Sequence, residues 1–358
     1  MAEDVRPLLQ QLATEVGLTT VHLARVHDAQ HAPDPAAYAA WVERGMHGSM
    51  DYLARGIDLR QDPRLRLKDA RTAAVFTLRY AADRPDDPGD RFGKVARYAW
   101  GRDYHNLFGK RLSRLMKRLR ARGIDCWGGV DTAPILERMW ARLAGVGFTG
   151  KNTVTIVPAT TSWMFLGVVF LAADSTPDSP ITKEHCGTCT RCLVGCPTDA
   201  FPQPYTLDSR RCIAYWTIEA RGLPPRELRP HFGRWLFGCD VCQEVCPHNT
   251  QPPGPDSEDL LPRHAWLDCV QVLNTPDAVL MTELTGTPLR RPKAHGLKRN
   301  ALLVLANRGQ DDVVDTVRAQ LEHSEPVVRA AAVWCLTTLG AAPNIPVGEH
   351  PLVLAEGG

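Results

Sequence analysis

Apolar and polar positions along the chain predict helices alternating with strands over the first half of the sequence. Three segments read as helices: Val5–Val16, residues 36–56 and Leu107–Ala121, the last with apolar residues recurring every three or four positions. Short apolar runs typical of strands occupy Ala73–Leu78, Val154–Val157 and Met164–Leu171. Strands that alternate with helices favour an α/β domain over residues 1–180.

The last hundred residues contain a weak internal repeat. Arg299–Leu305 aligns with Arg329–Cys335 at a period of 30 residues, and Asp311–His323 between them reads as another helix. Helices that repeat at such a period suggest a short HEAT-like stack. The stack should dock on the rest of the protein, because each repeat buries its apolar face only against a neighbour.

Two proline-rich linkers, Asp174–Pro180 and Asn249–Glu258, separate these regions from a middle segment. We therefore expect a multidomain α+β protein with three parts: an α/β domain at residues 1–180, a ferredoxin-like domain at 181–255 and a helical domain at 256–358.

Cysteines in the middle segment carry the strongest chemical signal. Cys186, Cys189, Cys192 and Cys196, followed by Pro197, have the spacing of bacterial two-cluster ferredoxins, in which the fourth cysteine binds the other cluster. A second, incomplete run and one upstream cysteine follow. This swap predicts one [4Fe-4S] cluster on Cys186, Cys189, Cys192 and Cys246, and a second on Cys196, Cys212, Cys239 and Cys242.

Other uses of these cysteines fit less well. Zinc sites need neither a third cysteine at this spacing nor a fourth followed by proline. A disulfide framework is disfavoured in a chain long enough to bury a core. Cys335 lies in an apolar helical run and reads as a packing residue.

The amino-acid composition excludes some classes of protein but does not indicate an activity. Hydrophobic residues make up 44% and charged residues 23%, which is ordinary for a soluble globular protein, and the net charge of +2 indicates no partner. The longest apolar stretch, around Trp163–Ala173, is too short to span a bilayer. Free thiols and the lack of an export signal predict a cytoplasmic protein without membrane contact.

Polar residues gather in two places within the first domain. One is Tyr98–His105, where Asp103 and His105 read as ligands, a proton relay or polar core. The other is Val130–Arg138 followed by the turn-like run Gly145–Asn152. Asp131 reads equally well as a helix N-cap or as a general acid, although an acid at neutral pH needs burial to raise its pKa. No dinucleotide-binding glycine motif follows a strand.

With these motifs combined, the chain resembles the epoxyqueuosine reductases from about residue 5 to about residue 340. The resemblance lies in Trp100–His105, Val130–Thr132, Gly145–Phe148 with Lys151 and Asn152, the ferredoxin run, Gly238–Gln243 and the helical tail. It implies a cytoplasmic oxidoreductase that removes the epoxide oxygen of epoxyqueuosine at the tRNA wobble position. It also implies base-off cobalamin as a cofactor, fed with electrons by the two clusters.

The resemblance also implies roles for individual residues. Asp131 matches the family's proton donor, and Asp103 and His105 match pocket residues. Further residues are expected to hold the corrin, position Asp131 or face the corrin from the cluster side: Arg60, Arg138, Lys151, Asn152, Asp240, Val241 and Gln243. The histidine motif of many cobalamin proteins is incomplete, because Phe108 stands where its glycine belongs. Some relatives also carry a cysteine near Ala96–Tyr98, which this chain lacks.

Two basic stretches are candidates for binding tRNA phosphates. One is the charged side of the helix Leu107–Ala121, which reads equally well as a solvated face. The favoured stretch lies at the start of the helical tail and comprises Arg290, Arg291, Lys293, Lys298 and Arg299. An external electron donor and a monomeric state complete the expectations. Two alternatives stay open: a dehalogenase-like enzyme acting on a small molecule, and an electron-transfer adaptor without cobalamin.

Overall fold

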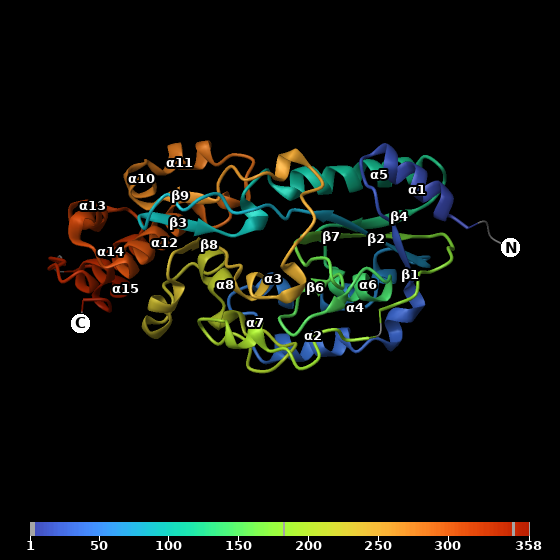
Figure 1. Ribbon diagram of the computed structural model, residues 1–358, viewed down its shortest axis with the longest axis horizontal. Helices are drawn as coiled ribbons and strands as arrows, with labels where there is room; N and C mark the ends of the chain where they lie inside the picture. The colour runs from blue at the N-terminus through green and yellow to red at the C-terminus, as the bar shows by residue number, and fades with distance from the viewer. Residues whose placement is uncertain (1–3, 182, 346–347, 358) are drawn as a thin grey trace.

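The computed structural model describes residues 4–181, 183–345 and 348–357. The molecule is elongated: the N-terminal part and its sheet occupy one end and the C-terminal helices the other, with α7 (Arg191–Val194) and α8 (Ile213–Ile218) of the middle segment between them (Figure 1). No helix in the described ranges is long and apolar enough to cross a membrane.

The main sheet has the strand order β1 (His22–Arg25), β2 (Thr72–Arg79), β7 (Met164–Leu171), β4 (Cys126–Gly129). Every neighbouring pair is antiparallel. The predicted strands at Ala73–Leu78 and Met164–Leu171 are confirmed, and so is the mixture of helix and sheet. The α/β class is wrong in strand direction, because helices between strands do not by themselves make a sheet parallel.

Helices cover both faces of this sheet. One face packs against α1 (Arg6–Glu15) and α5 (Lys110–Arg120), whose Leu112, Leu115 and Leu119 are fully buried. The other face packs against α6 (Glu137–Leu143), mainly through Trp140. Alternate residues of β2 therefore point to different cores, as the two-residue period of a strand requires. Three short helices lie between β1 and β2: α2 (Asp34–Glu43), α3 (Asp51–Ala54) and α4 (Ile57–Gln61).

A second sheet joins all three predicted parts of the chain. Its order is β8 (Trp235–Phe237), β3 (Phe92–Val95), β9 (Trp266–Asp268), with β3 parallel to β8 and antiparallel to β9. The loop after β2 thus carries the first segment across to the other end of the molecule, where β3 pairs with strands from the middle segment and the tail.

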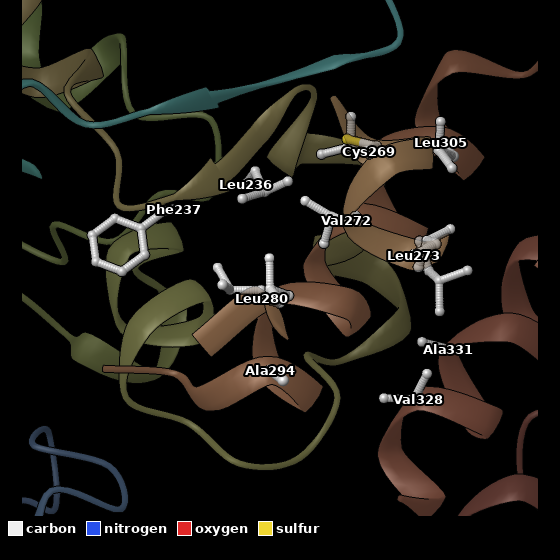
Figure 2. Packing of buried hydrophobic residues seen from close by; sticks show 14 of the residues in the cluster. Leu236, Phe237, Cys269, Val272, Leu273, Leu280, Ala294, Leu305, Val328 and Ala331 are labelled. Carbon is white, nitrogen blue, oxygen red and sulfur yellow. The ribbon is translucent and has the colours of Figure 1, made fainter. Parts of the chain in front are cut away.

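The tail consists of α10 (Cys269–Asn274), α11 (Asp277–Glu283), α12 (Lys293–Arg308), α13 (Val314–Ala319), α14 (Pro326–Thr338) and α15 (Pro351–Leu354). The two repeated segments lie in α12 and α14, which pack together. Figure 2 shows Leu236 and Phe237 of β8 in the same core as Val272, Leu280 and Val328 of the tail. The tail therefore docks on the second sheet, as the repeat predicts.

Candidate active site and cluster segment

Four of the predicted cluster cysteines line a single cavity. Cys186, Cys189, Cys192 and Cys246 surround a cavity of about 30 Å³, which Lys151, His185 and Arg191 also border. Cys192 comes from α7 and Cys246 follows α9 (Val241–Glu244). The fold therefore brings together the set that spacing assigns to one cluster, and we call it the outer cysteine set.

The other four predicted ligands, Cys196, Cys212, Cys239 and Cys242, are all partly buried, and we call them the inner cysteine set. Burial raises the pKa of Cys239 and Cys242 well above the ordinary value, and the nearby Cys212 thiol raises both further. Cys196 in turn acts on Cys212 and Cys242. Because such effects require proximity, the four thiols form a second group, and iron would have to displace their protons on binding.

Lys151 and Asn152 hold both cysteine loops in place. They stand on the turn between β5 (Phe148–Thr149) and β6 (Thr155–Ile156). The Lys151 ammonium donates to the carbonyls of Gly187 at 2.6 Å and Cys189 at 3.1 Å. The buried Asn152 amide donates to the Cys242 carbonyl at 3.0 Å. These polar atoms therefore already have partners that join the first domain to the cluster segment.

Three residues predicted to face the corrin from the cluster side have similar surroundings. The buried Asp240 carboxylate accepts a hydrogen bond from the Arg97 backbone N–H at 2.8 Å. The Gln243 amide donates to the Ser162 hydroxyl at 3.0 Å. Val241 packs beside a small core that contains Trp235. All three contribute to the contact between the cluster segment and its neighbours.

Asp131 lies in a loop after β4 with φ of 43°, in the left-handed region that aspartate tolerates better than most residues. The helix that follows begins only at Glu137 and has Leu136 at its N-cap, so the N-cap interpretation of Asp131 is wrong. The Asp131 side chain is 65% exposed. Its Oδ2 accepts a hydrogen bond from the Tyr104 hydroxyl at 2.5 Å.

His105 stands between two carboxylates. Its Nδ1 lies 2.8 Å from Asp103 Oδ1, and its Nε2 lies 3.5 Å from Asp131 Oδ2. At that longer distance the contact is electrostatic, and within the described residues Nε2 is a buried nitrogen without a hydrogen-bond partner. His105 opens a π-helical turn, His105–Gly109, of the kind often found at functional sites. The Tyr104 ring stacks on His105 at 4.1 Å and on Phe165 at 4.2 Å.

These contacts set the charges of the group. Although the Asp131 side chain is exposed, the surrounding protein removes part of its hydration, which works to raise its pKa; the close contact with His105, the hydrogen bond from Tyr104 and the positive charges of His105 and Arg291 outweigh this effect and leave the pKa lowered. Burial works to lower the pKa of His105, yet Asp103 and Asp131 raise it to about 9. At neutral pH, His105 is therefore a cation paired with the ionised Asp131, and the pair holds one proton.

Sequence reasoning missed two residues at this site, Tyr104 and Glu137, although both lie inside the motifs already noted. Burial, with a smaller contribution from the charge of Asp131, raises the pKa of Glu137 to about 7. Its Oε1 is another buried atom without a partner among the described residues. Both predicted arginines act electrostatically on Glu137, and each is already bonded to the backbone: Arg60 to the Arg55 carbonyl and Arg138 to the Thr153 carbonyl.

The basic stretch at the start of the tail divides into two groups. Arg290, Arg291 and Lys293 are exposed, and Arg291 pairs with Glu219 at 2.8 Å close to Asp131 and the Tyr52 ring. Lys298 and Arg299 face inward along α12, so their predicted tRNA contact is wrong.

The interior positions of Lys298 and Arg299 have clear partners. Arg299 is fully buried and donates to the carbonyls of Ala220, Gly222 and Trp216. Lys298 is 5% exposed and pairs with Asp277 at 2.9 Å. Both cations therefore fasten the tail to the cluster segment or to its own helices.

Comparison with known families agrees with this geometry. A model of a 4Fe-4S double cluster binding domain matches residues 185–249, which include all eight predicted ligands. An epoxyqueuosine reductase family model matches residues 60–132, and HEAT repeats match residues 291–347. The chain therefore carries a domain for two [4Fe-4S] clusters and a repeat tail.

Several relatives and solved structures are similar over almost the whole chain. The epoxyqueuosine reductase of Xanthomonas campestris is 35% identical over 94% of this chain and 97% of its own length. That of Pseudomonas aeruginosa is 36% identical over 91% of this chain and 92% of its own. A crystal structure of an epoxyqueuosine reductase with an epoxyqueuosine-modified tRNA-Tyr stem loop gives a TM-score of 0.87 at 26% identity, covering 94% of this chain and 90% of that one.

A Bacillus subtilis epoxyqueuosine reductase structure, with a TM-score of 0.85 at 25% identity and coverage of 94% and 90%, has its catalytic aspartate loop swung out of the active site. The extent of these similarities shows that this chain belongs to the epoxyqueuosine reductase family.

Proposed function

We propose that this protein reduces epoxyqueuosine to queuosine in the anticodon of tRNA, using cobalamin and electrons delivered through its two clusters. The reaction takes an epoxide, two electrons and two protons to an alkene and water. The observation that carries the proposal is the Asp131–His105 pair, a proton store in the same molecule as two sets of four cysteines. Family membership supports the substrate, since the relatives are named for this reaction.

The residues present fit a large polar cofactor beside Asp131. Two buried atoms without partners in the described parts of the chain, His105 Nε2 and Glu137 Oε1, are open to polar groups such as corrin amides. The nearby Arg60 and Arg138 would help to hold it, and Lys151, Asn152, Asp240, Val241 and Gln243 would shape the contact between domains behind it. When bound, reduced cobalamin supplies the electrons that break the epoxide C–O bond.

His105 is unsuited to act as a lower ligand to cobalt. Asp103 occupies its Nδ1, and at neutral pH its Nε2 carries a proton and has no lone pair for a metal. This arrangement agrees with the incomplete histidine motif in the sequence and fits a corrin that would be held without a protein histidine on cobalt.

The protein's own residues supply and position the protons. His105 passes its proton to Asp131, and Asp131 presents that proton to the epoxide oxygen as the C–O bond breaks. Tyr104 fixes the orientation of the Asp131 carboxylate through its short hydrogen bond. The solvent exposure of Asp131 allows the pair to be reloaded for the second proton.

Substrate binding is assigned to the exposed part of the basic stretch. Arg290, Arg291 and Lys293 would contact phosphates and position the tRNA, while the modified base is splayed out toward Asp131. We further propose a monomeric, cytoplasmic enzyme served by an external electron donor.

The first experiment is anaerobic reconstitution of both clusters followed by EPR with added cob(II)alamin. A base-off cobalt signal, together with reducible [4Fe-4S] signals and conversion of epoxyqueuosine in tRNA, is the expected result. Intact clusters with an unchanged cobalt spectrum and no queuosine in nuclease digests would contradict the proposal and favour an electron-transfer adaptor.

A further inference from the structure

The outer cysteine set lies beneath an unusual surface. Val194, the residue between Cys192 and Cys196 that ends α7, has a side chain 82% exposed to solvent. Tyr205, whose backbone N–H donates to the Lys151 carbonyl at 2.9 Å, is 44% exposed and lies close enough to Cys186 and Cys192 for their charges to act on it. An exposed valine and an exposed tyrosine beside the outer cysteine set are side chains that a docked protein would cover, and aromatic residues are enriched at such contacts.

Charge around this surface is predominantly positive. Lys183 and Arg191 are exposed on the stretch that carries Cys186 and Cys189, and Arg191 borders the cavity of the outer cysteine set. The exposed carboxylate on the same stretch is Glu184. Complementary charge mainly raises the rate at which two proteins associate. Weak redox complexes also bury only small interface areas. This surface therefore suits an acidic protein that binds transiently.

The depth of the two cysteine sets gives the electron path a direction. Cys186 and Cys189 of the outer set lie on a stretch of mostly exposed residues, 183–191, whereas Cys239 of the inner set lies between the buried residues Gly238 and Asp240. The outer set is therefore reached more directly from solvent, and α7, which carries Cys192, packs on α9, which carries Cys242 of the inner set. Electrons that enter at the outer cluster have a short route inward.

We propose that the surface formed by Val194, Tyr205, Lys183 and Arg191 is the docking site for a small acidic electron-carrier protein. This inference rests on the proposed function only in that the reaction consumes two electrons. The carrier is oxidised by one electron at each encounter and the outer cluster is reduced by one, so two encounters supply one turnover. An aromatic and an aliphatic side chain over a redox centre favour a protein partner, whereas tRNA phosphates need only the cations.

The test measures cluster reduction without tRNA or cobalamin. Photoreduced flavodoxin, an acidic one-electron carrier, is mixed anaerobically with the reconstituted full-length protein in a stopped-flow instrument, and bleaching of the cluster absorbance is followed. Val194→Glu and the double variant Lys183→Glu/Arg191→Glu are each expected to lower the second-order rate constant about tenfold. The rate constant of the wild-type protein should fall as salt is added. The rate constant of the double variant should depend much less on salt.

Matched controls separate docking from damage to the clusters. Val279→Glu changes a valine that is 46% exposed on α11, and Lys68→Glu reverses an exposed lysine in the first domain; both should match wild type. Iron content and reduction by dithionite should be unchanged in every variant. If Val194→Glu loses iron, the inference is judged by the flavodoxin rate constant of the double variant alone.

Unchanged flavodoxin rate constants in the double variant would overturn the inference, and so would a loss confined to tRNA binding, which would assign the surface to the substrate. Wild-type protein that flavodoxin reduces through this surface, but that leaves epoxyqueuosine in tRNA unconverted, would defeat the proposed function and leave the docking site standing.

Discussion

The site around Asp131 and the segment around the cysteines differ in how completely their polar groups are satisfied. In the cluster segment, Lys151, Asn152 and Gln243 donate to backbone or hydroxyl oxygens across the domain contact. Around Asp131, described residues leave the buried atoms His105 Nε2 and Glu137 Oε1 without partners, and the backbone takes a left-handed turn. The cluster segment is therefore held in place by completed hydrogen bonds. The site around Asp131 instead keeps buried polar atoms available to bond a cofactor or substrate.

The largest expected effect is at the site around Asp131. Asp131→Asn removes the carboxylate through which the proton of His105 reaches the epoxide oxygen, so turnover should fall by about a thousandfold. Cluster content and the rate of cluster reduction should stay as in wild type. Single-turnover conversion of epoxyqueuosine tRNA measures the effect, and a loss below tenfold would remove Asp131 from the role of proton donor.

Substitutions at the contacts of the cluster segment should change the stability of the protein rather than the chemical step. Arg299→Ala removes the donor from the carbonyls of Ala220, Gly222 and Trp216, which should lower the free energy of unfolding by about 3 kcal/mol at roughly 1 kcal/mol each. Chemical denaturation of the anaerobic protein gives the value. Arg290→Ala is the matched control, because this exposed arginine should change stability by less than about 0.5 kcal/mol.

Asn152→Ala sharpens the comparison at the contact between the two regions. The substitution leaves the Cys242 carbonyl unpaired and should lower the unfolding free energy by about 1–2 kcal/mol. The inner cluster should also be lost faster on exposure to air, which iron release and absorbance follow. Stability and cluster lifetime equal to wild type would show that this hydrogen bond contributes nothing to holding the inner loop.

The pH dependence of turnover tests the Asp131–His105 pair, with a smaller expected effect. His105 holds its proton below its pKa of about 9 and loses it above, so turnover should decline through that value as pH rises. His105→Gln leaves Asp131 to load its proton alone, and the declining limb should therefore move to lower pH with about a tenfold loss near neutrality. A limb that stays near pH 9 in the variant would assign it to another group.

How much the sequence could predict depended on the range of the interactions. The cysteine sets follow from ligand spacing, and the strand at Met164–Leu171 follows from a local apolar run; both are properties of neighbouring residues. Asp131 was identified through its motif, but its loop geometry was not, because the helix begins six residues later at Glu137. Which way α12 turns its side chains depends on contacts with residues 216–236, so the burial of Arg299 was beyond sequence periodicity.

Tyr104 and Glu137 show the same limit at the active site. Each stands in a motif that was recognised, yet nothing local distinguishes a tyrosine that bonds Asp131 from one that only packs. The antiparallel direction of the main sheet also depends on long-range pairing, such as Ala74 with Val169.

The sheet of β8, β3 and β9 has a consequence for how the protein is made. Its strands lie at residues 92–95, 235–237 and 266–268, so about 140 residues must be synthesised after β3 before β8 follows, and about 170 before β9 follows. Cys239 and Cys242 follow β8 directly. Iron–sulfur loading of the inner set should therefore come late in biosynthesis, after the helical tail has begun to appear, and a truncated chain ending near residue 255 would be a poor acceptor for cluster assembly.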